Sequence, residues 1–135
     1  CSSDLQTNEI IAANICPRKL FLAALFHDVG KLWDYRPTNT SMTVWTSTDH
    51  RNKIHHITRS VMEWNKAFED QGPNCFKPEQ IAGVQDEVIH AILAHHGRLE
   101  WHSPVEPRTK MAFLLHYCDA ISARMDDSDR LFTEG

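Results

Sequence analysis

Ionisable side chains interrupt apolar sequence patterns at four places in this 135-residue chain. These places are His27-Asp28, His55-His56, His95-His96 and Asp119. Burial of a polar side chain costs free energy unless the side chain has a partner, so such positions are informative about chemistry. Imidazole and carboxylate groups bind divalent ions such as Mn, Fe and Zn, and histidine also carries protons near neutral pH. The residue types therefore point to metal or acid–base chemistry.

Each of these sites also has a structural explanation when it is taken singly. A histidine at a helix end is most often a cap or a partner of the helix dipole, and a lone aspartate such as Asp119 is most often a hydrogen-bonded structural group. The joint pattern favours a metal site, because the residues come from separate predicted helices that face one bundle interior. We expect one or two divalent ions, with Asp28 between them if there are two. The sequence does not distinguish Mn, Fe, Mg, Zn and Ni.

Two helices are predicted to carry the first half of this set. The run LFLAALFHDVGKLW is apolar on every side and favours a central helix over residues 18–33. Apolar residues spaced by three and four predict a helix over residues 52–71, stopped by Gly72-Pro73; they are Ile54, Ile57, Val61, Trp64 and Phe68. Residues 34–50, between the two helices, are predicted to form a long loop with a short ribbon through residues 42–46. Loops of this length are often functional, so this one is a candidate substrate cover.

Two further helices are predicted to carry the second half. Pro78 opens a helix over residues 79–96 that Gly97 ends, and His95 continues its apolar stripe. After a loop over residues 98–107, a last helix over residues 108–125 has one face formed by Met111, Leu114, Leu115, Cys118, Ser122 and Met125. A further apolar pattern predicts a first helix over residues 4–15. The histidines that fall off the stripes are expected to be exposed; they are His50, His90, His102 and His116. The fold class is all-α, a bundle of five or more helices with a long loop after the second.

Composition limits the classes of function. With 41% apolar and 24% charged residues, the chain is expected to fold as one globular domain. Its formal charge of −4 provides no global cationic field to hold long nucleic acid by phosphate neutralisation. No apolar stretch reaches the length of about 20 residues that spans a bilayer. Nothing resembles a secretion signal, so a cytoplasmic location with reduced cysteines is expected. Since the chain begins with Cys1, it is expected to be part of a longer protein.

Two stretches carry a resemblance to a known family. The run ALFHDVGKLWDY resembles the signature of the HD superfamily, all-α metal-dependent phosphohydrolases named after an adjacent His-Asp pair. The stretch AILAHHGRLEWHSPVEPRTKMAFLLHYCDAISARMD is similar to the HD domain of YhaM-type 3′–5′ exoribonucleases. There, an SHHG-x-x-E-x-x-SP element precedes a helix that ends in H-x-x-D. The resemblance covers residues 17–126 and implies a single HD domain over residues 1–135.

The resemblance implies roles for particular residues. The signature pair and the distal aspartate bind metal in the family, and members with two ions add a histidine from the middle helix and one from the HH pair. In the middle helix His56 matches better than His55, whereas the choice between His95 and His96 stays open. The implied metal ligands are His27, Asp28, His56, His95 and Asp119. The implied contacts to substrate phosphate are Lys31, His96 and Arg98, and the implied catalytic residues are Asp28, Lys31 and His96.

One departure from the family pattern divides the functional hypotheses. The pattern begins with a histidine on the helix before the signature pair, and this chain has no histidine upstream of His27. The first hypothesis is a metal-dependent phosphohydrolase that cleaves a phosphoester of a nucleotide or a nucleic-acid end. The alternative is a catalytically weak or inactive module that binds a nucleotide or a partner and regulates a neighbouring domain, such as a nucleic-acid-binding one. A third class is a di-iron oxygenase, which some HD-fold proteins represent.

Overall fold

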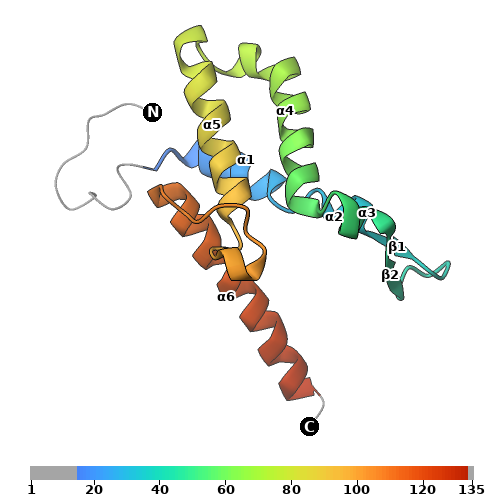
Figure 1. Ribbon diagram of the computed structural model, residues 1–135. Helices are drawn as coiled ribbons and strands as arrows, with labels where there is room; N and C mark the ends of the chain where they lie inside the picture. Colours follow the sequence, from blue (N-terminus) through green and yellow to red (C-terminus); the bar gives the residue numbers. More distant parts are fainter. Residues whose placement is uncertain (1–14, 134–135) are drawn as a thin grey trace.

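The computed structural model describes residues 15–133, with side chains through residue 127. Its secondary structure is mainly helical, which confirms the all-α prediction (Figure 1). The elements are α1 (Pro17–Phe26), α2 (Lys31–Asp34), β1 (Tyr35–Pro37), β2 (Trp45–Ser47), α3 (Asp49–Lys53), α4 (His56–Cys75), α5 (Pro78–Ala94), the 3-10 helix η1 (Leu99–Trp101) and α6 (Lys110–Thr133). The helix predicted over residues 4–15 lies outside the described residues except for its last position.

The apolar segment predicted as one helix over residues 18–33 forms two helices separated by a turn. α1 begins with Pro17 in its first turn, where the missing N–H is not needed, and it ends at Phe26. Residues 27–30 then turn, and α2 begins at Lys31. The reason is close packing at Gly30, whose backbone N–H donates to Ser60 Oγ of α4 at 3.0 Å. The prediction of a continuous helix was therefore wrong at the His-Asp pair itself.

The middle helix starts later and ends later than its pattern indicated. Ile57, Trp64 and Phe68 are buried as the spacing predicts, but α4 begins at His56 and the residues before it form the separate helix α3. The predicted stop at Gly72-Pro73 is wrong, because α4 continues to Cys75. Pro73 removes a single N–H donor near the helix end, and the Phe76 N–H closes the last turn by donating to Gly72 O at 2.9 Å.

α5 and α6 complete the helical core. On α5 the buried stripe contains Val84, Val88 and Ile92, as predicted. On α6 the predicted face holds only at its start: Met111 and Leu115 are buried, whereas its later members Cys118, Ser122 and Met125 are exposed. Figure 1 shows the reason, since the C-terminal half of α6 projects beyond the other helices. A stripe remains exposed where no neighbouring helix of the described part covers it.

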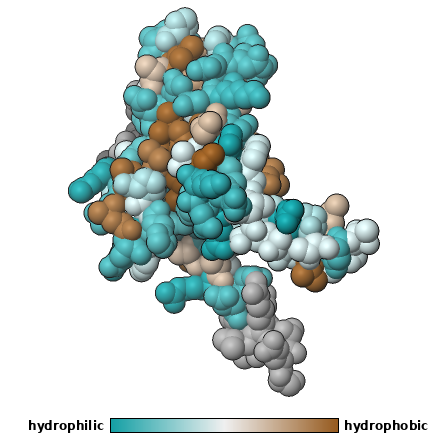
Figure 2. Space-filling model, turned by 45° about the vertical axis from the view of Figure 1, so that its right-hand side comes forward, coloured by the Kyte–Doolittle hydropathy of each residue, from teal (hydrophilic) through white to brown (hydrophobic). Residues whose placement is uncertain are grey.

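The long loop after α2 contains the expected ribbon. β1 and β2 pair antiparallel, with Tyr35 opposite Ser47 and Pro37 opposite Trp45. The ribbon projects to one side of the bundle in Figure 1. Figure 2 shows apolar side chains on the surface of both the helical part and the ribbon, among hydrophilic ones. No helix among the described residues has the length and apolar character needed to cross a bilayer. Cys75 and Cys118 have free thiols.

Candidate metal centre

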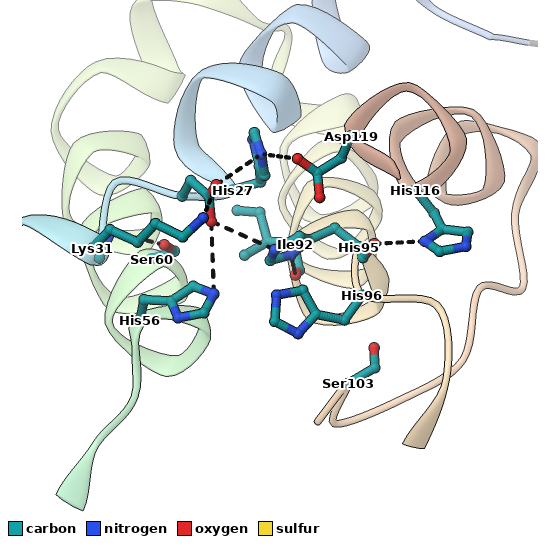
Figure 3. Close-up of polar contacts among 12 residues, drawn as sticks. His27, Lys31, His56, Ser60, Ile92, His95, His96, Ser103, His116 and Asp119 are labelled. Atoms are coloured by element: carbon teal, nitrogen blue, oxygen red, sulfur yellow. Dashed lines mark hydrogen bonds and ion pairs between the residues drawn. The ribbon is translucent and has the colours of Figure 1, made fainter. Parts of the chain in front are cut away.

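The structure brings together all five side chains that were expected to bind metal. Figure 3 labels four of them, His27, His56, His95 and Asp119. His27 follows the last residue of α1, and Asp28 stands in the turn before α2. His56 is the first residue of α4, and His95 follows the last residue of α5. Asp119 comes from the middle of α6. Most of these positions are helix ends, so the site lies where several helices begin or stop around one point.

Asp28 is at the centre of the cluster. Its Oδ2 lies 3.4 Å from His27 Nε2, and its Oδ1 lies 3.6 Å from both His56 Nε2 and His95 Nε2. His27 Nε2 is also 3.5 Å from Asp119 Oδ1. The two oxygens of one carboxylate thus face different sets of histidines.

Gly30 allows the turn that carries Asp28 to approach α4. A Cβ atom at Gly30 would lie 2.0 Å from the carbonyl oxygen of His56 and 2.8 Å from its Cα atom. Those are backbone atoms, which cannot move aside as a flexible side chain can. Any other residue at position 30 would therefore separate Asp28 from His56.

The histidines of the cluster are held in one tautomer by their outer nitrogens. Nδ1 of His27 lies 2.7 Å from Ala24 O, Nδ1 of His95 lies 2.7 Å from Ile92 O, and Nδ1 of His96 lies 2.9 Å from Trp101 O. A carbonyl oxygen only accepts, so each Nδ1 carries the proton and donates it. In the neutral ring the lone pair is then on Nε2, which is the atom that faces the cluster.

His56 is held in a different way, by a buried carboxylate. Asp34 is completely buried; its Oδ2 accepts the backbone N–H of His56 at 3.0 Å and lies 3.3 Å from His56 Nδ1. Its Oδ1 lies 2.7 Å from His50 Nδ1, and Arg59 Nε–H donates to His50 Nε2 at 3.1 Å. A carboxylate behind a metal-binding histidine fixes the ring and raises its basicity as a ligand. Asp34 thus orients His56 toward Asp28.

The donor set fits a cation. Asp28 Oδ1, His56 Nε2 and His95 Nε2 are buried atoms without a hydrogen-bond partner among the described residues. With their protons on Nδ1, both histidines point lone pairs at a carboxylate oxygen, so acceptors face acceptors. Such an arrangement is costly unless a positive ion lies between the groups. Imidazole and carboxylate donors suit Mn, Fe or Zn.

The ligand atoms form two groups, each of which could hold one ion. One contains His27, Asp28 and Asp119, and the other contains His56, His95 and His96, with the atoms of each group within 4.8 Å of one another. Asp28 adjoins both groups, since its Oδ1 also faces His56 and His95. This arrangement can hold one ion or two. The second group also contains both histidines of the HH pair, His95 and His96.

Electrostatics keep the ligands in suitable protonation states. Burial, and next the neighbouring His55, lower the pKa of His56 to about 4, so its ring is neutral at pH 7. Burial and then His95 lower the pKa of His96 below its usual value. Burial acts to raise the pKa of Asp28, but its charged neighbours, among them the Lys31 ammonium, hold it well below its usual range. The carboxylate is therefore ionised and the two imidazoles carry lone pairs.

The opposite shift occurs at the edge of the cluster. Burial acts to lower the pKa of His27, but its contact with Asp119 and the charge of Asp28 outweigh burial and raise it. The contact with His27 in turn lowers the pKa of Asp119. Each of these two residues therefore favours the charged form of the other.

The three expected substrate contacts have different positions. Lys31 Nζ lies 2.6 Å from Asp28 Oδ2 and is about half exposed, so the ammonium stands at the mouth of the cluster. His96 belongs to one of the candidate metal groups. Arg98 is not brought into the cluster by any contact among the described residues: its guanidinium pairs with Glu100 and lies over the ring of Trp101.

Sequence reasoning missed several supporting residues. Asp34 was predicted to begin a loop, and no local pattern in the sequence marks it as a support for His56. Three histidines expected to be exposed are half-buried and bonded, namely His50, His90 and His116; His102 is exposed as expected. His116 Nδ1 lies 2.8 Å from His95 O, a contact between α6 and the end of α5 that spacing along one helix cannot reveal.

Comparison with known proteins identifies the family of this site. The family model described as the HD domain matches residues 7–124. The chain belongs to the HD domain family. It is 37% identical to the 3′–5′ exoribonuclease YhaM of Bacillus subtilis over 112 residues, which are 82% of this chain and 32% of the relative. The chain is 38% identical to YhaM of Bacillus pumilus and 35% identical to YhaM of a Geobacillus species. Both matches cover 82% of this chain, and they cover 32% and 31% of the two relatives, respectively. No solved structure shows a significant match.

Family membership confirms the expectation drawn from the HDxGK and HHG motifs. At the family level, the chain is of the metal-dependent phosphohydrolase class. It spans about a third of the length of the curated relatives that it matches. The activity of those relatives as whole proteins therefore does not transfer directly to this chain.

Proposed function

We propose that this chain is a metal-dependent phosphodiesterase that cleaves a phosphodiester at the end of a single-stranded nucleic acid. The observation that carries the proposal is the buried set of unpartnered ligand atoms on Asp28, His56 and His95. These atoms are aimed at one another from three separate elements of the fold. Stable burial of such atoms is explained by a bound cation.

Five residues would hold the cation or cations: His27, Asp28, His56, His95 and Asp119, with His96 as a further candidate donor. When bound, a divalent ion lowers the pKa of a water molecule and offsets negative charge on the phosphoryl oxygens. We propose manganese as the first metal to test, because its ligand preferences match this mixed nitrogen and oxygen set.

The chain's own residues supply substrate binding and proton transfer. The Lys31 ammonium lies at the mouth of the cluster, where it can bind a phosphate oxygen while keeping its pair with Asp28. His96 has its proton on Nδ1, held by Trp101 O, and a lowered pKa, so at neutral pH its Nε2 can accept a proton or bind metal. A standing positive charge toward phosphate is thus supplied by Lys31 rather than by His96.

The choice of a nucleic-acid end as substrate rests on two observations. The relatives at 35–38% identity are named 3′–5′ exoribonucleases. The net charge of −4 provides little attraction for a long polyanion, so a short end bound at the site is the better match for this chain.

Metal reconstitution followed by two hydrolysis assays tests the proposal. The metal-stripped chain, reloaded with Mn(II), is expected to release p-nitrophenol from bis-p-nitrophenyl phosphate and to shorten a 5′-labelled RNA oligonucleotide. Asp28→Asn is expected to abolish both reactions. The matched control is Asp49→Asn, the same chemical change at an exposed residue in the first turn of α3.

Two results would contradict the proposal. Manganese content near zero after reloading would argue that the cluster does not bind the ion and would favour a regulatory binding module. Full metal loading without hydrolysis of either substrate would leave a metal-binding module without catalytic activity.

A further inference from the structure

A pocket lies beside the metal centre, between the loop after α5 and the first half of α6. It has a volume of about 370 Å³. Its lining is rich in rings and guanidinium groups, since it includes Arg98, Trp101, Arg108, Phe113, His116 and Tyr117. None of these six residues has been placed among the metal ligands.

Three aromatic side chains around this pocket are half exposed. Trp101 is 50% exposed, Phe113 is 46% exposed and Tyr117 is 57% exposed. Isolated apolar residues on a surface are common, but several around one concavity mark a binding site. Because a ring presents two flat apolar faces, such a site suits a flat ligand.

The wall that carries Trp101 is held in place by backbone hydrogen bonds. The Trp101 N–H donates to Arg98 O at 3.0 Å, and Ser103 N–H donates to the same oxygen at 3.1 Å. The Trp101 carbonyl accepts the Nδ1 proton of His96 at 2.9 Å. The pocket is therefore formed before any ligand binds, which reduces the entropy lost on binding.

Charge at the rim suits phosphate. The Arg98 guanidinium lies over the Trp101 ring, 4.8 Å from its centroid. Arg98 pairs with Glu100 at 3.2 Å and Arg108 pairs with Glu106 at 3.9 Å, with all four side chains at least half exposed. Exposed ion pairs contribute little free energy, so a phosphate can replace either carboxylate at small cost.

The pocket and the metal centre share structural elements. His116 lines the pocket, and its Nδ1 lies 2.8 Å from the carbonyl of His95. Asp119 follows His116 by three residues on α6, which is less than one helical turn. Figure 3 shows His116 beside His95. A nucleic acid with one phosphodiester at the metal centre could therefore place a neighbouring nucleotide in the pocket.

We propose that this pocket binds a nucleobase of the single-stranded substrate, stacked against Trp101 and Tyr117, with Arg98 and Arg108 near its phosphates. Stacking on aromatic rings is tolerant of base identity, because every base has a π face. The pocket thus selects single strands, whose bases are free to stack, without selecting a sequence. This inference rests on the proposed function, since it names where a part of that substrate binds.

Fluorescence anisotropy with a 5′-fluorescein-labelled hexamer of oligoadenylate RNA tests the pocket. The 135-residue chain is measured in EDTA, so that the RNA is bound but not cut. Trp101→Ala is expected to raise the Kd about ten-fold, and Trp101→Phe, which keeps a π face, is expected to restore most of the affinity. Tyr117→Ala is expected to weaken binding in the same direction.

Phe21→Ala is the matched control, because Phe21 is an aromatic residue that is 67% exposed on α1 and does not line the pocket. It is expected to bind the RNA like the unmodified chain. Equal affinities for Trp101→Ala, Trp101→Phe and the unmodified chain would overturn the proposal and leave the pocket as a surface for a protein partner. The absence of any binding by the unmodified chain would also overturn it. A chain that binds the RNA through Trp101 but never hydrolyses it with Mn(II) would instead contradict the proposed function alone.

Discussion

Replacement of Asp34 by asparagine is expected to weaken Mn(II) binding although Asp34 is not itself a candidate ligand. The hydrogen bonds behind His56 run in one direction: Arg59 donates to His50 Nε2, and His50 Nδ1 therefore keeps its proton and donates to Asp34 Oδ1. The other oxygen accepts the backbone N–H of His56 and lies 3.3 Å from His56 Nδ1. Both ends of the carboxylate thus face donors.

An asparagine side chain has one oxygen and one amide group in place of two oxygens. Whichever way it is turned, its NH₂ group meets either the N–H of His50 or the N–H groups of His56. A buried donor left without an acceptor costs about 1–3 kcal/mol of stability. Loss of the group that orients a metal-bound histidine typically lowers metal affinity by about 10- to 100-fold, or about 1.4–2.7 kcal/mol.

Isothermal titration of the metal-stripped chain with MnCl₂, together with urea unfolding, measures both quantities. Asp49→Asn is the matched control, because Asp49 lies in the neighbouring helix α3 with 89% of its side chain exposed. We expect that control to stay within about 0.5 kcal/mol of the unmodified chain in stability. An Asp34→Asn variant that binds Mn(II) as tightly as the unmodified chain would refute the reasoning, since His56 would then need no carboxylate behind it.

Three other perturbations follow from the same geometry. Mn(II) at about 100 times its Kd should add about 2.7 kcal/mol to the free energy of unfolding. Calorimetry should therefore show a Tm that is higher by about 10 °C with Mn(II) than without it, and the Tm of Asp28→Asn should not rise. Gly30→Ala places a Cβ 2.0 Å from His56 O and should lower the free energy of unfolding in urea by about 3 kcal/mol. Gly83→Ala is the control: its Cβ would have nothing within 4 Å, and it should raise the free energy of unfolding by about 0.5–1 kcal/mol. Equal effects of the two variants would contradict the close approach of Gly30 to His56. Lys31→Met should lower kcat/KM for bis-p-nitrophenyl phosphate by about ten-fold or more without weakening Mn(II) binding, whereas Lys53→Met, far more exposed and paired with Asp49, should change neither.

The sequence predicted the helices that bury a continuous apolar stripe, because such a stripe is a local property of the chain. The stripe through Trp64 and Phe68 predicted the middle helix, and the stripe through Val84 and Val88 correctly led to His95. The prediction was wrong at Pro73, where one lost N–H near a helix end proved insufficient to stop α4. It was also wrong along α6, because whether an apolar face is covered depends on where neighbouring helices end.

The candidate ligands could be predicted from the sequence, whereas the residues that hold them in place could not. His27, His56 and His95 interrupt apolar patterns, which is visible in the sequence alone. Asp34 and His116 act through contacts between segments 16 to 22 positions apart, with His50, His56 and His95. Nothing in the local pattern marks a residue whose only role is to hold another one, so these residues became evident only in the folded chain.

The turn at the His-Asp pair explains why two adjacent residues can serve one cluster. On a continuous helix, neighbouring side chains point about 100° apart and would diverge. Here α1 ends at Phe26, and the turn over residues 27–30 lets the Nε2 of His27 and the Oδ2 of Asp28 lie 3.4 Å apart. The same turn lets Gly30 pack against the backbone of His56, which brings Asp28 Oδ1 to 3.6 Å from His56 Nε2. The break in the helix that the apolar pattern failed to predict is therefore the feature that lets one carboxylate face α1 with one oxygen and the ends of α4 and α5 with the other.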